Sequence, residues 1–422
     1  MRFIHAADIH LDSPLRGLSA YQDAPADLLR GATREAFSQL VSTAIDEQID
    51  FMVIAGDLYD GDWPDFNTGL FFCSEMGRLH RAGVPVFLLF GNHDAESHMT
   101  KALRMPGNVQ CFSANGSQVH TIDKLRVALH GRSFKVRDTT ENLVSSYAEP
   151  VRDYFNIGVL HTALEGYVEH PNYAPCTLEE LHAKGYDYWA LGHVHEHKLW
   201  TGRSTIVFPG NLQGRSIRET GRRGAVMVTV DGDRAPQVER LFVDVLRWEA
   251  VAVDVSACES LNAVGVAASR ELSNLLETDA HVPRAVRVTF TGETSLHGDL
   301  FGREQELRAH VLAEIAVIGH DKLWLEKVKL TTRPRAAVTA ATAGVSDGLG
   351  SDAMAELEAL LQEALADEVL QKELRDDFNQ MMAKAPELAH EVATFKHVRE
   401  GNLAPILEDV APGLLARLAM KE

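Results

Sequence analysis

Residues of metal-binding type recur in five short clusters within the first 200 residues of the chain. Seven of these residues could act as ligands: Asp8, His10, Asp57, Asn92, His161, His193 and His195. Their oxygen and nitrogen atoms, without thiolate, suit manganese, iron or zinc better than calcium or copper(I). Seven protein ligands are too many for one ordinary ion, and they suit two ions that share a carboxylate.

The charge of such a centre favours a phosphate substrate. Two dications bring about four positive charges, and two carboxylates with one bridging hydroxide remove about three, so a net positive centre remains to attract a phosphodiester. Asn92 can bind a metal without adding negative charge. His93, in the same crevice, is then free to assist the transition state, and Asp94 is expected to hold the His93 ring in one orientation.

Each cluster follows a short apolar run, and such runs are typical of strands buried on both faces. The runs cover residues 3–7, 51–55, 84–90, 157–160 and 188–191. Apolar residues at helical spacing lie within residues 28–49, and again at Leu70, Phe71 and Leu79. This alternation predicts an α/β sheet. The carboxyl ends of its strands line one crevice, where the clusters would converge.

The character of the chain changes after about residue 241. Strands are predicted at residues 286–290 and 323–330, with a helix between them that carries Leu307, Val311, Leu312 and Ile315. We therefore expect a first domain over residues 1–240, a small α+β domain over 241–334, a flexible linker over 335–351 and a helical region over 352–422. An apolar stripe begins the last region, at Leu357, Leu360, Leu361 and Leu365. Such a stripe either packs on its own domain or docks on a partner.

Composition limits how the chain could bind nucleic acid. It has 422 residues, 45% of them hydrophobic, and a formal net charge of -19. This acidity argues against a protein that coats nucleic acid through bulk charge, so any DNA contact must be local. Two basic groups could contact a phosphate backbone, or could be solvated loops with internal ion pairs: Arg215, Arg218, Arg222 and Arg223, and Arg132, Lys135 and Arg137.

The four cysteines are far apart and form no C-x-x-C pair, so neither a zinc ribbon nor a disulfide framework is indicated. We expect reduced thiols in a cytoplasmic protein. No signal-peptide core and no apolar run of about 20 residues is present in the sequence, so we expect neither export nor a membrane span.

Five motifs together resemble the signature of the calcineurin-like metallophosphoesterases: D-I-H at 8–10, G-D at 56–57, G-N-H-D at 91–94, the lone His161, and G-H-V-H at 192–195. The stretches HAADIHLDSPL and GDLYDGDW are similar to those of SbcD-type DNA repair nucleases, particularly their YhaO-like branch. The resemblance implies a sandwich-type metallophosphoesterase core over residues 1–240, with the second domain as a cap.

The resemblance also implies roles for the clustered residues. One ion would be bound by Asp8, His10, Asp57 and His195, and a second, bridged by Asp57, by Asn92, His161 and His193. The family favours manganese and cleaves DNA phosphodiesters by attack of a metal-bound hydroxide. His93 would stabilise the transition state and the departing oxygen. The implied partners are DNA and an SbcC-like coiled-coil ATPase that grips the C-terminal helices, and a homodimer is also allowed.

One position departs from the SbcD-type pattern. Those nucleases usually read G-D-L-F-H at the second motif, whereas this chain has Asp60 in place of the histidine. No metal ligand is lost, so hydrolysis should survive, and the mode and direction of cutting are left open. Two other functions also stay open: a phosphoesterase for small substrates such as cyclic nucleotides, and a scaffold that kept the fold without catalysis.

Overall fold

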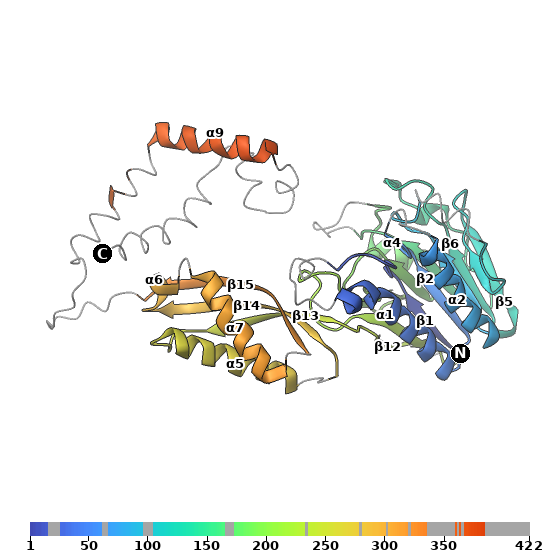
Figure 1. Cartoon of the computed structure of the whole chain (residues 1–422). Coiled ribbons are helices and arrows are strands. Elements are labelled where there is room, and N and C mark those ends of the chain that lie inside the picture. Colours follow the sequence, from blue (N-terminus) through green and yellow to red (C-terminus); the bar gives the residue numbers. More distant parts are fainter. Residues whose placement is uncertain are drawn as a thin grey trace. The chain divides into compact units, whose positions relative to one another are not determined.

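The computed structural model describes residues 1–15, 26–60, 66–95, 104–164, 173–232, 235–277, 281–300, 303–319, 322–335, 359–360, 363 and 367–384. The chain divides into two compact units (Figure 1). The first comprises Met1–Ala250, Asp279–Val286 and Asp321–Glu326, and the second comprises Val251–Thr278, Arg287–His320 and Lys327–Glu422. No helix among the described residues is long and apolar enough to cross a membrane.

The first unit contains two six-stranded sheets. One has the order β12-β11-β1-β2-β3-β4, in which β1 to β4 are parallel, β11 is antiparallel to β1, and β12 is antiparallel to β11. Its strands are β1 (Arg2–Ala6), β2 (Phe51–Ala55), β3 (Val86–Leu89), β4 (Val109–Cys111), β11 (Gly224–Thr229) and β12 (Gln237–Phe242).

The second sheet has the order β5-β6-β7-β8-β10-β9, in which β6, β7, β8 and β10 are parallel. Its strands are β5 (Gln118–Ile122), β6 (Val127–Gly131), β7 (Phe155–His161), β8 (Tyr188–Gly192), β9 (Lys198–Trp200) and β10 (Thr205–Phe208). Two short 3-10 helices, Asp123–Leu125 and Val144–Ser146, and helix α4 (Leu178–Ala183) connect these strands.

The two sheets pack face to face through alternate residues of their strands. Phe3 of β1 stacks on Phe51 of β2, with ring centroids 4.7 Å apart, and meets Tyr188 of β8 edge-on at 5.4 Å. Ile4 and Ala6 point to the other face of the first sheet, because successive side chains of a strand alternate. The expected sandwich-type core is confirmed, although the sequence predicted one sheet where the structure has two.

Helices α1 (Ala26–Asp46) and α2 (Asn67–Arg81) lie side by side on the outer face of the first sheet (Figure 1). Phe37 of α1 stacks on Phe72 of α2, with centroids 5.8 Å apart. Leu79 is buried as expected, but Leu70 is 60% exposed, because the inward face of α2 runs through Phe72, Met76 and Leu79 instead.

A three-stranded sheet follows, formed by β13 (Arg247–Asp254), β14 (Arg284–Thr294) and β15 (Leu323–Pro334) in that order. Helices α5 (Leu261–Glu277) and α7 (Glu304–Gly319) pack against each other, and α6 (His297–Leu300) is a single turn. Leu307, Val311 and Ile315 are buried as expected, whereas Leu312 is on the exposed side of α7. The domain boundary at residue 240 stays a prediction, because β13 runs from one unit into the other.

Much of the C-terminal prediction falls outside the described residues. This applies to residues 336–351 of the linker and to three leucines of the apolar stripe, Leu357, Leu361 and Leu365. Leu360 is described and is 57% exposed. Helix α9 (Glu368–Lys384) lies within the region that we expected to be helical.

Candidate metal centre

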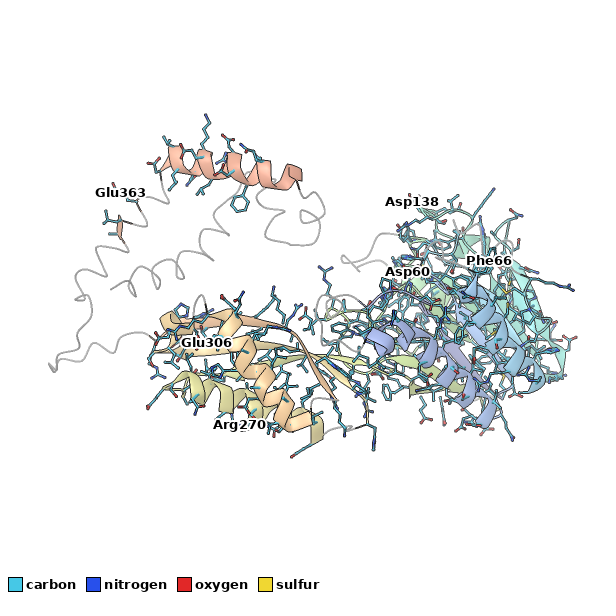
Figure 2. All side chains as sticks on the ribbon, in the orientation of Figure 1. Asp60, Phe66, Asp138, Arg270, Glu306 and Glu363 are labelled. Carbon is cyan, nitrogen blue, oxygen red and sulfur yellow. The ribbon has the colours of Figure 1, made fainter. Side chains whose placement is uncertain are left out.

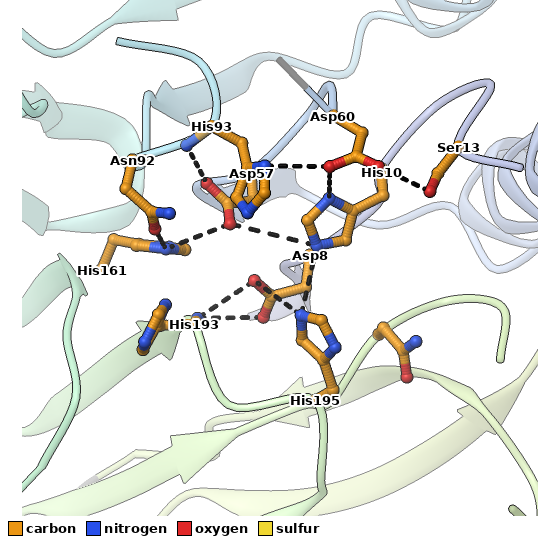
Figure 3. Close-up of polar contacts among 12 residues, drawn as sticks. Asp8, His10, Ser13, Asp57, Asp60, Asn92, His93, His161, His193 and His195 are labelled. Carbon is orange, nitrogen blue, oxygen red and sulfur yellow. Dashed lines mark hydrogen bonds and ion pairs between the residues drawn. The ribbon is translucent and has the colours of Figure 1, made fainter. Parts of the chain in front are cut away.

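The structure brings all seven expected ligands together at one end of the two facing sheets (Figure 3). Asp8, His10 and His195 form one group whose ligand atoms lie within 4.8 Å of one another, and Asp57, His161 and His193 form another. Asn92 joins the second group, with its Oδ1 2.9 Å from Nε2 of His161. The assignment of these residues as ligands stays a prediction, but their convergence is a property of the fold.

The convergence follows from the parallel strands. Asp8 and His10 follow β1, Asp57 follows β2 and Asn92 follows β3, whereas His161 ends β7 in the facing sheet. The loops after β1 and β2 are tied together, because the amides of Asp8 and His10 donate to the carbonyl oxygens of Gly56 (3.0 Å) and Asp57 (3.1 Å). The carboxyl ends of parallel strands thus provide the crevice that the sequence predicted.

Four of the seven residues have a left-handed backbone, which is uncommon outside glycine. Their φ angles are 49° at Asp8, 46° at His10, 50° at Asp57 and 102° at His193. Two neighbouring glycines leave the room that these side chains need. A Cβ at Gly56 (φ 99°) would overlap Nδ1 of His161, and one at Gly91 would overlap Oδ1 of Asp57. The backbone is therefore shaped for this cluster of side chains.

The donor set fits two divalent cations. Asp8 and Asp57 are almost completely buried, and within the described part of the chain neither carboxylate has an ion pair with lysine or arginine. A buried carboxylate is costly unless a charge or hydrogen bonds compensate it. Asp8 accepts hydrogen bonds from the amide of His193, and Asp57 accepts one from the amide of His93 at 3.1 Å. Cations bound here would supply the remaining compensation.

The pKa values of the site without bound metal also indicate that positive charge stabilises its carboxylates. Burial raises the pKa of Asp8. Burial opposes ionisation of Asp57 as well, but the neighbouring His161 outweighs it and holds the pKa of Asp57 well below its usual value. In turn, burial alone would lower the pKa of His161, and the charge of Asp57 raises it to about 9. A cation bound by His161 would replace that proton.

Two histidines are oriented by a partner on their outer ring nitrogen. Nδ1 of His161 lies 3.0 Å from the carbonyl oxygen of Ala55, which leaves Nε2 facing Asn92 and Asp57. Nδ1 of His195 lies 2.7 Å from Oε1 of Glu219, and its Nε2 faces Asp8 and His10. Such partners fix the tautomer of a metal-binding imidazole. Glu219 was not predicted from the sequence, since only its proximity in the fold connects it with His195.

We expect Glu219→Gln to weaken metal binding at the Asp8, His10 and His195 group by about 10- to 100-fold, as is typical for the orienting partner of a ligand histidine. The carboxylate that positions His195 is replaced by an amide of the same shape. Titration of the metal-free protein with Mn²⁺ against a fluorescent chelator measures the loss. Glu196→Gln, an exposed carboxylate paired with Lys198, is the matched control. Equal affinities in both variants would refute the orienting role of Glu219.

The expected role of Asp94 is wrong. Its carboxylate accepts hydrogen bonds from the backbone amides of Leu58 (3.1 Å), Tyr59 (2.9 Å) and Gly91 (3.0 Å), so it fastens the loop after β2 to the loop after β3. Nδ1 of His93 instead lies 2.9 Å from Oδ1 of Asp60 (Figure 3). The residue that departs from the SbcD-type pattern therefore orients His93.

The surroundings of these carboxylates differ. Burial raises the pKa of Asp94 to about 7. The hydrogen bond with His93 holds the pKa of Asp60 well below its usual value. Asp60 also accepts a hydrogen bond from the hydroxyl of Ser13 at 2.8 Å, and a guanidinium nitrogen of Arg215 lies 3.7 Å from its Oδ2.

Asp60→Asn and Asp94→Asn should therefore fail in different ways. Asp60→Asn should lower kcat by about 10- to 100-fold, because it weakens the contact that positions His93. The unfolding temperature should change less than for Asp94→Asn, because the side chain of Asp60 is partly exposed. Asp94→Asn should lower the free energy of unfolding by about 2 to 3 kcal/mol, because a buried acceptor of three amides becomes partly a donor. Kinetics and thermal unfolding of both variants check this. A stable Asp94→Asn protein with the larger loss of kcat would restore our original assignment.

The basic residues near the site divide into two kinds. Arg223 is buried and donates to the carbonyl oxygen of His195 and to Oδ1 of Asn211, so its predicted substrate contact is wrong. Arg215 is held between Glu219 (3.4 Å) and Asp60, and it helps to position both carboxylates. Arg222 is stacked over the ring of Phe242 at 4.7 Å. Arg218 is exposed, and the substrate contacts of Arg215, Arg218 and Arg222 stay predictions.

His5 lies inside strand β1 and is a buried core histidine, as its position within an apolar run predicts. Its Nδ1 lies 3.0 Å from the hydroxyl oxygen of Tyr188, and its Nε2 lies 3.1 Å from the carbonyl oxygen of Leu191. Burial lowers the pKa of His5 to about 3, so the ring is neutral.

Comparison with known proteins gives two family matches. The description "Calcineurin-like phosphoesterase" matches residues 1–197, and "Metallophosphoesterase YhaO, middle domain" matches residues 248–333. Over 297 residues the chain is 34% identical to the uncharacterized metallophosphoesterase YhaO of Bacillus subtilis, and this match covers 69% of the chain and 72% of that protein.

Two further relatives carry the name DNA double-strand break repair protein Mre11. That of Methanopyrus kandleri is 27% identical over 285 residues, a match that covers 61% of this chain and 60% of that protein. That of Sulfurisphaera tokodaii is 25% identical over 267 residues, a match that covers 60% of this chain and 66% of that protein. In both cases less than two thirds of the relative is matched.

Proposed function

Because the chain belongs to the calcineurin-like metallophosphoesterase family, we propose that it is a two-metal nuclease that hydrolyses phosphodiester bonds of DNA in repair or end processing. The observation that carries the proposal is the position of Asp57. Its Oδ2 lies 3.4 Å from Nε2 of His161 and 3.9 Å from Nε2 of His10, so one carboxylate reaches both groups of ligands. This is the arrangement that two ions sharing a carboxylate require.

We assign the ions to two sites. Asp8, His10, Asp57 and His195 would hold one, and Asp57, Asn92, His161 and His193 would hold the other. Manganese is our choice of metal, because the nucleases that the motifs resemble favour it; the oxygen and nitrogen ligands without thiolate would also suit iron or zinc. When bound, the two ions supply Lewis-acid activation of water and of the phosphoryl group.

The protein's own groups then act on the phosphate. His93 lies beside the ligands, with its ring centroid 5.1 Å from that of His10, and Asp60 fixes its orientation. A positioned imidazole of this kind can donate a hydrogen bond or a proton to the departing oxygen. The roles of His93 and Asp60 rest on their contacts, and our assignment of the two ions uses neither residue as a ligand.

The choice of DNA as substrate is supported by the two relatives named for double-strand break repair. We further propose an SbcC-like coiled-coil ATPase as partner of the C-terminal helices and the cytoplasm as compartment. These proposals extend the resemblance of the motifs, and a pull-down of the ATPase with the full chain and with a chain ended before residue 352 tests the partner directly.

Hydrolysis assays separate the possible substrates. The metal-free protein is loaded with Mn²⁺ and given bis(p-nitrophenyl) phosphate, cyclic nucleotides, and single-stranded, duplex and hairpin DNA. The proposal predicts cleavage of the small diester and of at least one DNA. Hydrolysis of cyclic nucleotides without DNA cleavage would instead identify a small-substrate phosphoesterase, and inactivity toward all of them would favour a scaffold.

A further inference from the structure

We propose that segment 132–137 (Arg132, Ser133, Phe134, Lys135, Val136 and Arg137) forms a phosphate subsite beside the metal centre, which holds the backbone of the DNA strand next to the bond that is cut. The inference rests on the proposed nuclease function and names residues that bind the substrate outside the metal centre. Lys135 and Arg137 supply its charge.

Ser133 and Phe134, at the start of segment 132–137, are hydrogen-bonded to the end of the strand that leads into Asn92 and His93. The amide of Phe134 donates to the carbonyl oxygen of Phe90 at 2.9 Å, and the amide of Phe90 donates to the hydroxyl oxygen of Ser133 at 3.0 Å. That hydroxyl donates in turn to the carbonyl oxygen of Phe112 at 2.7 Å. Phe90 directly precedes Gly91, so these hydrogen bonds connect the segment with the loop of the site.

Phe134 of this segment also contacts a residue of the candidate metal centre. The ring of Phe134 meets that of His161 edge-on, with centroids 5.6 Å apart. The segment therefore lies next to a candidate ligand of the metal centre.

Lys135 and Arg137 differ from the other basic residues near the site. Both are exposed, and within the described part of the chain neither has an ion pair with a carboxylate. Arg132 is paired with Glu141 at 2.9 Å, and Arg215 is enclosed by Asp60 and Glu219. An unpaired, exposed cation can neutralise a phosphate and release the counterion condensed on the nucleic acid, whereas a paired cation must first lose its partner.

The shape of the surface favours a single strand over a duplex. A pocket of about 290 Å³ is lined by Arg132, Phe134, Lys135, Val136 and Thr139 among others, whereas Arg137 does not line it. Val136 is 54% exposed and offers apolar surface for a sugar or base. Asp138 (labelled in Figure 2) and Glu141 line the same cavity, so their negative charge limits the subsite to few phosphates. Such a cavity suits one or two nucleotides of a separated strand.

The test compares the double variant Lys135→Gln/Arg137→Gln with the native protein. Binding of a fluorescent single-stranded oligonucleotide to the metal-free proteins is followed by anisotropy at several salt concentrations. We expect an increase in Kd of about tenfold, and a slope of log Kd against log salt that is smaller by about 1 to 1.5, as two lost phosphate contacts predict for a single strand. The value of kcat/KM for bis(p-nitrophenyl) phosphate should fall much less than the affinity for the oligonucleotide, because this ester has a single phosphate and no neighbouring one for the segment to hold.

The matched control is Lys124→Gln/Arg203→Gln, which removes the same two charges. Lys124 precedes β6 and Arg203 precedes β10, so both lie at the amino ends of parallel strands, opposite the metal centre. Equal Kd and salt slope in the native protein and the double variant would overturn the inference. The inference would also be overturned if inorganic phosphate displaced the oligonucleotide and bound as tightly as the oligonucleotide does. That result would identify a site for small anions. Native protein that cleaves the small ester but no DNA would instead overturn the proposed function.

Discussion

Asp57→Asn is expected to abolish hydrolysis of every substrate, with kcat lower by about 1,000-fold or more, which corresponds to about 4 kcal/mol of transition-state stabilisation. Asparagine keeps the shape of the side chain and can still accept the hydrogen bond from the amide of His93. What it removes is the charge of a carboxylate that reaches both His10 and His161. Metal analysis should therefore find that the variant retains at most one ion per chain.

A control separates this effect from loss of structure. Asp153→Asn changes an exposed carboxylate, whose side chain is 75% exposed, and should leave metal content and kcat at native values. Asp57→Asn should keep the native circular dichroism, because asparagine keeps the shape of the side chain and the hydrogen bond from the amide of His93, and His161 can lose its proton once the charge of residue 57 is gone. If Asp57→Asn binds two ions and turns over at the native rate, the shared ligand is assigned to the wrong residue.

His93→Gln should lower kcat by about 100- to 10,000-fold while two ions remain bound, since the loss is that of a positioned proton donor. His93 is outside the two ligand groups of the proposal, so its removal should separate catalysis from metal binding. The loss should be largest for substrates with poor leaving groups, such as DNA, and smaller for a nitrophenyl ester, whose leaving group needs little protonation. Rates on both substrates, with metal analysis of the same samples, provide the measurement.

His80→Gln is the control for this change, because His80 lies exposed at the end of α2. It should leave both rates unchanged. An equal loss on the two substrates would remove the role of His93 toward the departing oxygen, and a loss of bound metal would make His93 a ligand.

The sequence predicted the positions of the site because each ligand lies directly after or at the end of a strand. This placement does not depend on the order of the strands within a sheet. Asp8, Asp57 and His161 therefore meet even though β7 belongs to a different sheet from β1 and β2. The apolar runs did not divide the strands between two sheets, and only the resemblance to a sandwich-type core implied the second sheet. Several of the strands that complete the two sheets, such as β4, β9 and β12, are short or half exposed and lack the apolar runs that mark buried strands.

The contacts around the ligands could not be predicted in the same way. Asp94 is adjacent to His93 in sequence, yet its side chain points toward the amides of the loop after β2, and Asp60 takes the contact with His93. Neighbours along a chain need not face each other, and the left-handed φ of Asp57 helps to set the course of that loop. Glu219 and Arg223 likewise depend on how the loop before β11 folds, which no motif specifies.

The central claim is that two ions share Asp57, and electron paramagnetic resonance of the protein loaded with Mn²⁺ tests it most directly. Two manganese ions bridged by one carboxylate are exchange-coupled, and they give closely spaced hyperfine lines that an isolated ion lacks. We predict this coupled spectrum at two ions per native chain, and the spectrum of an isolated ion for Asp57→Asn. Two bound ions with only the isolated six-line signal in the native protein would contradict the account.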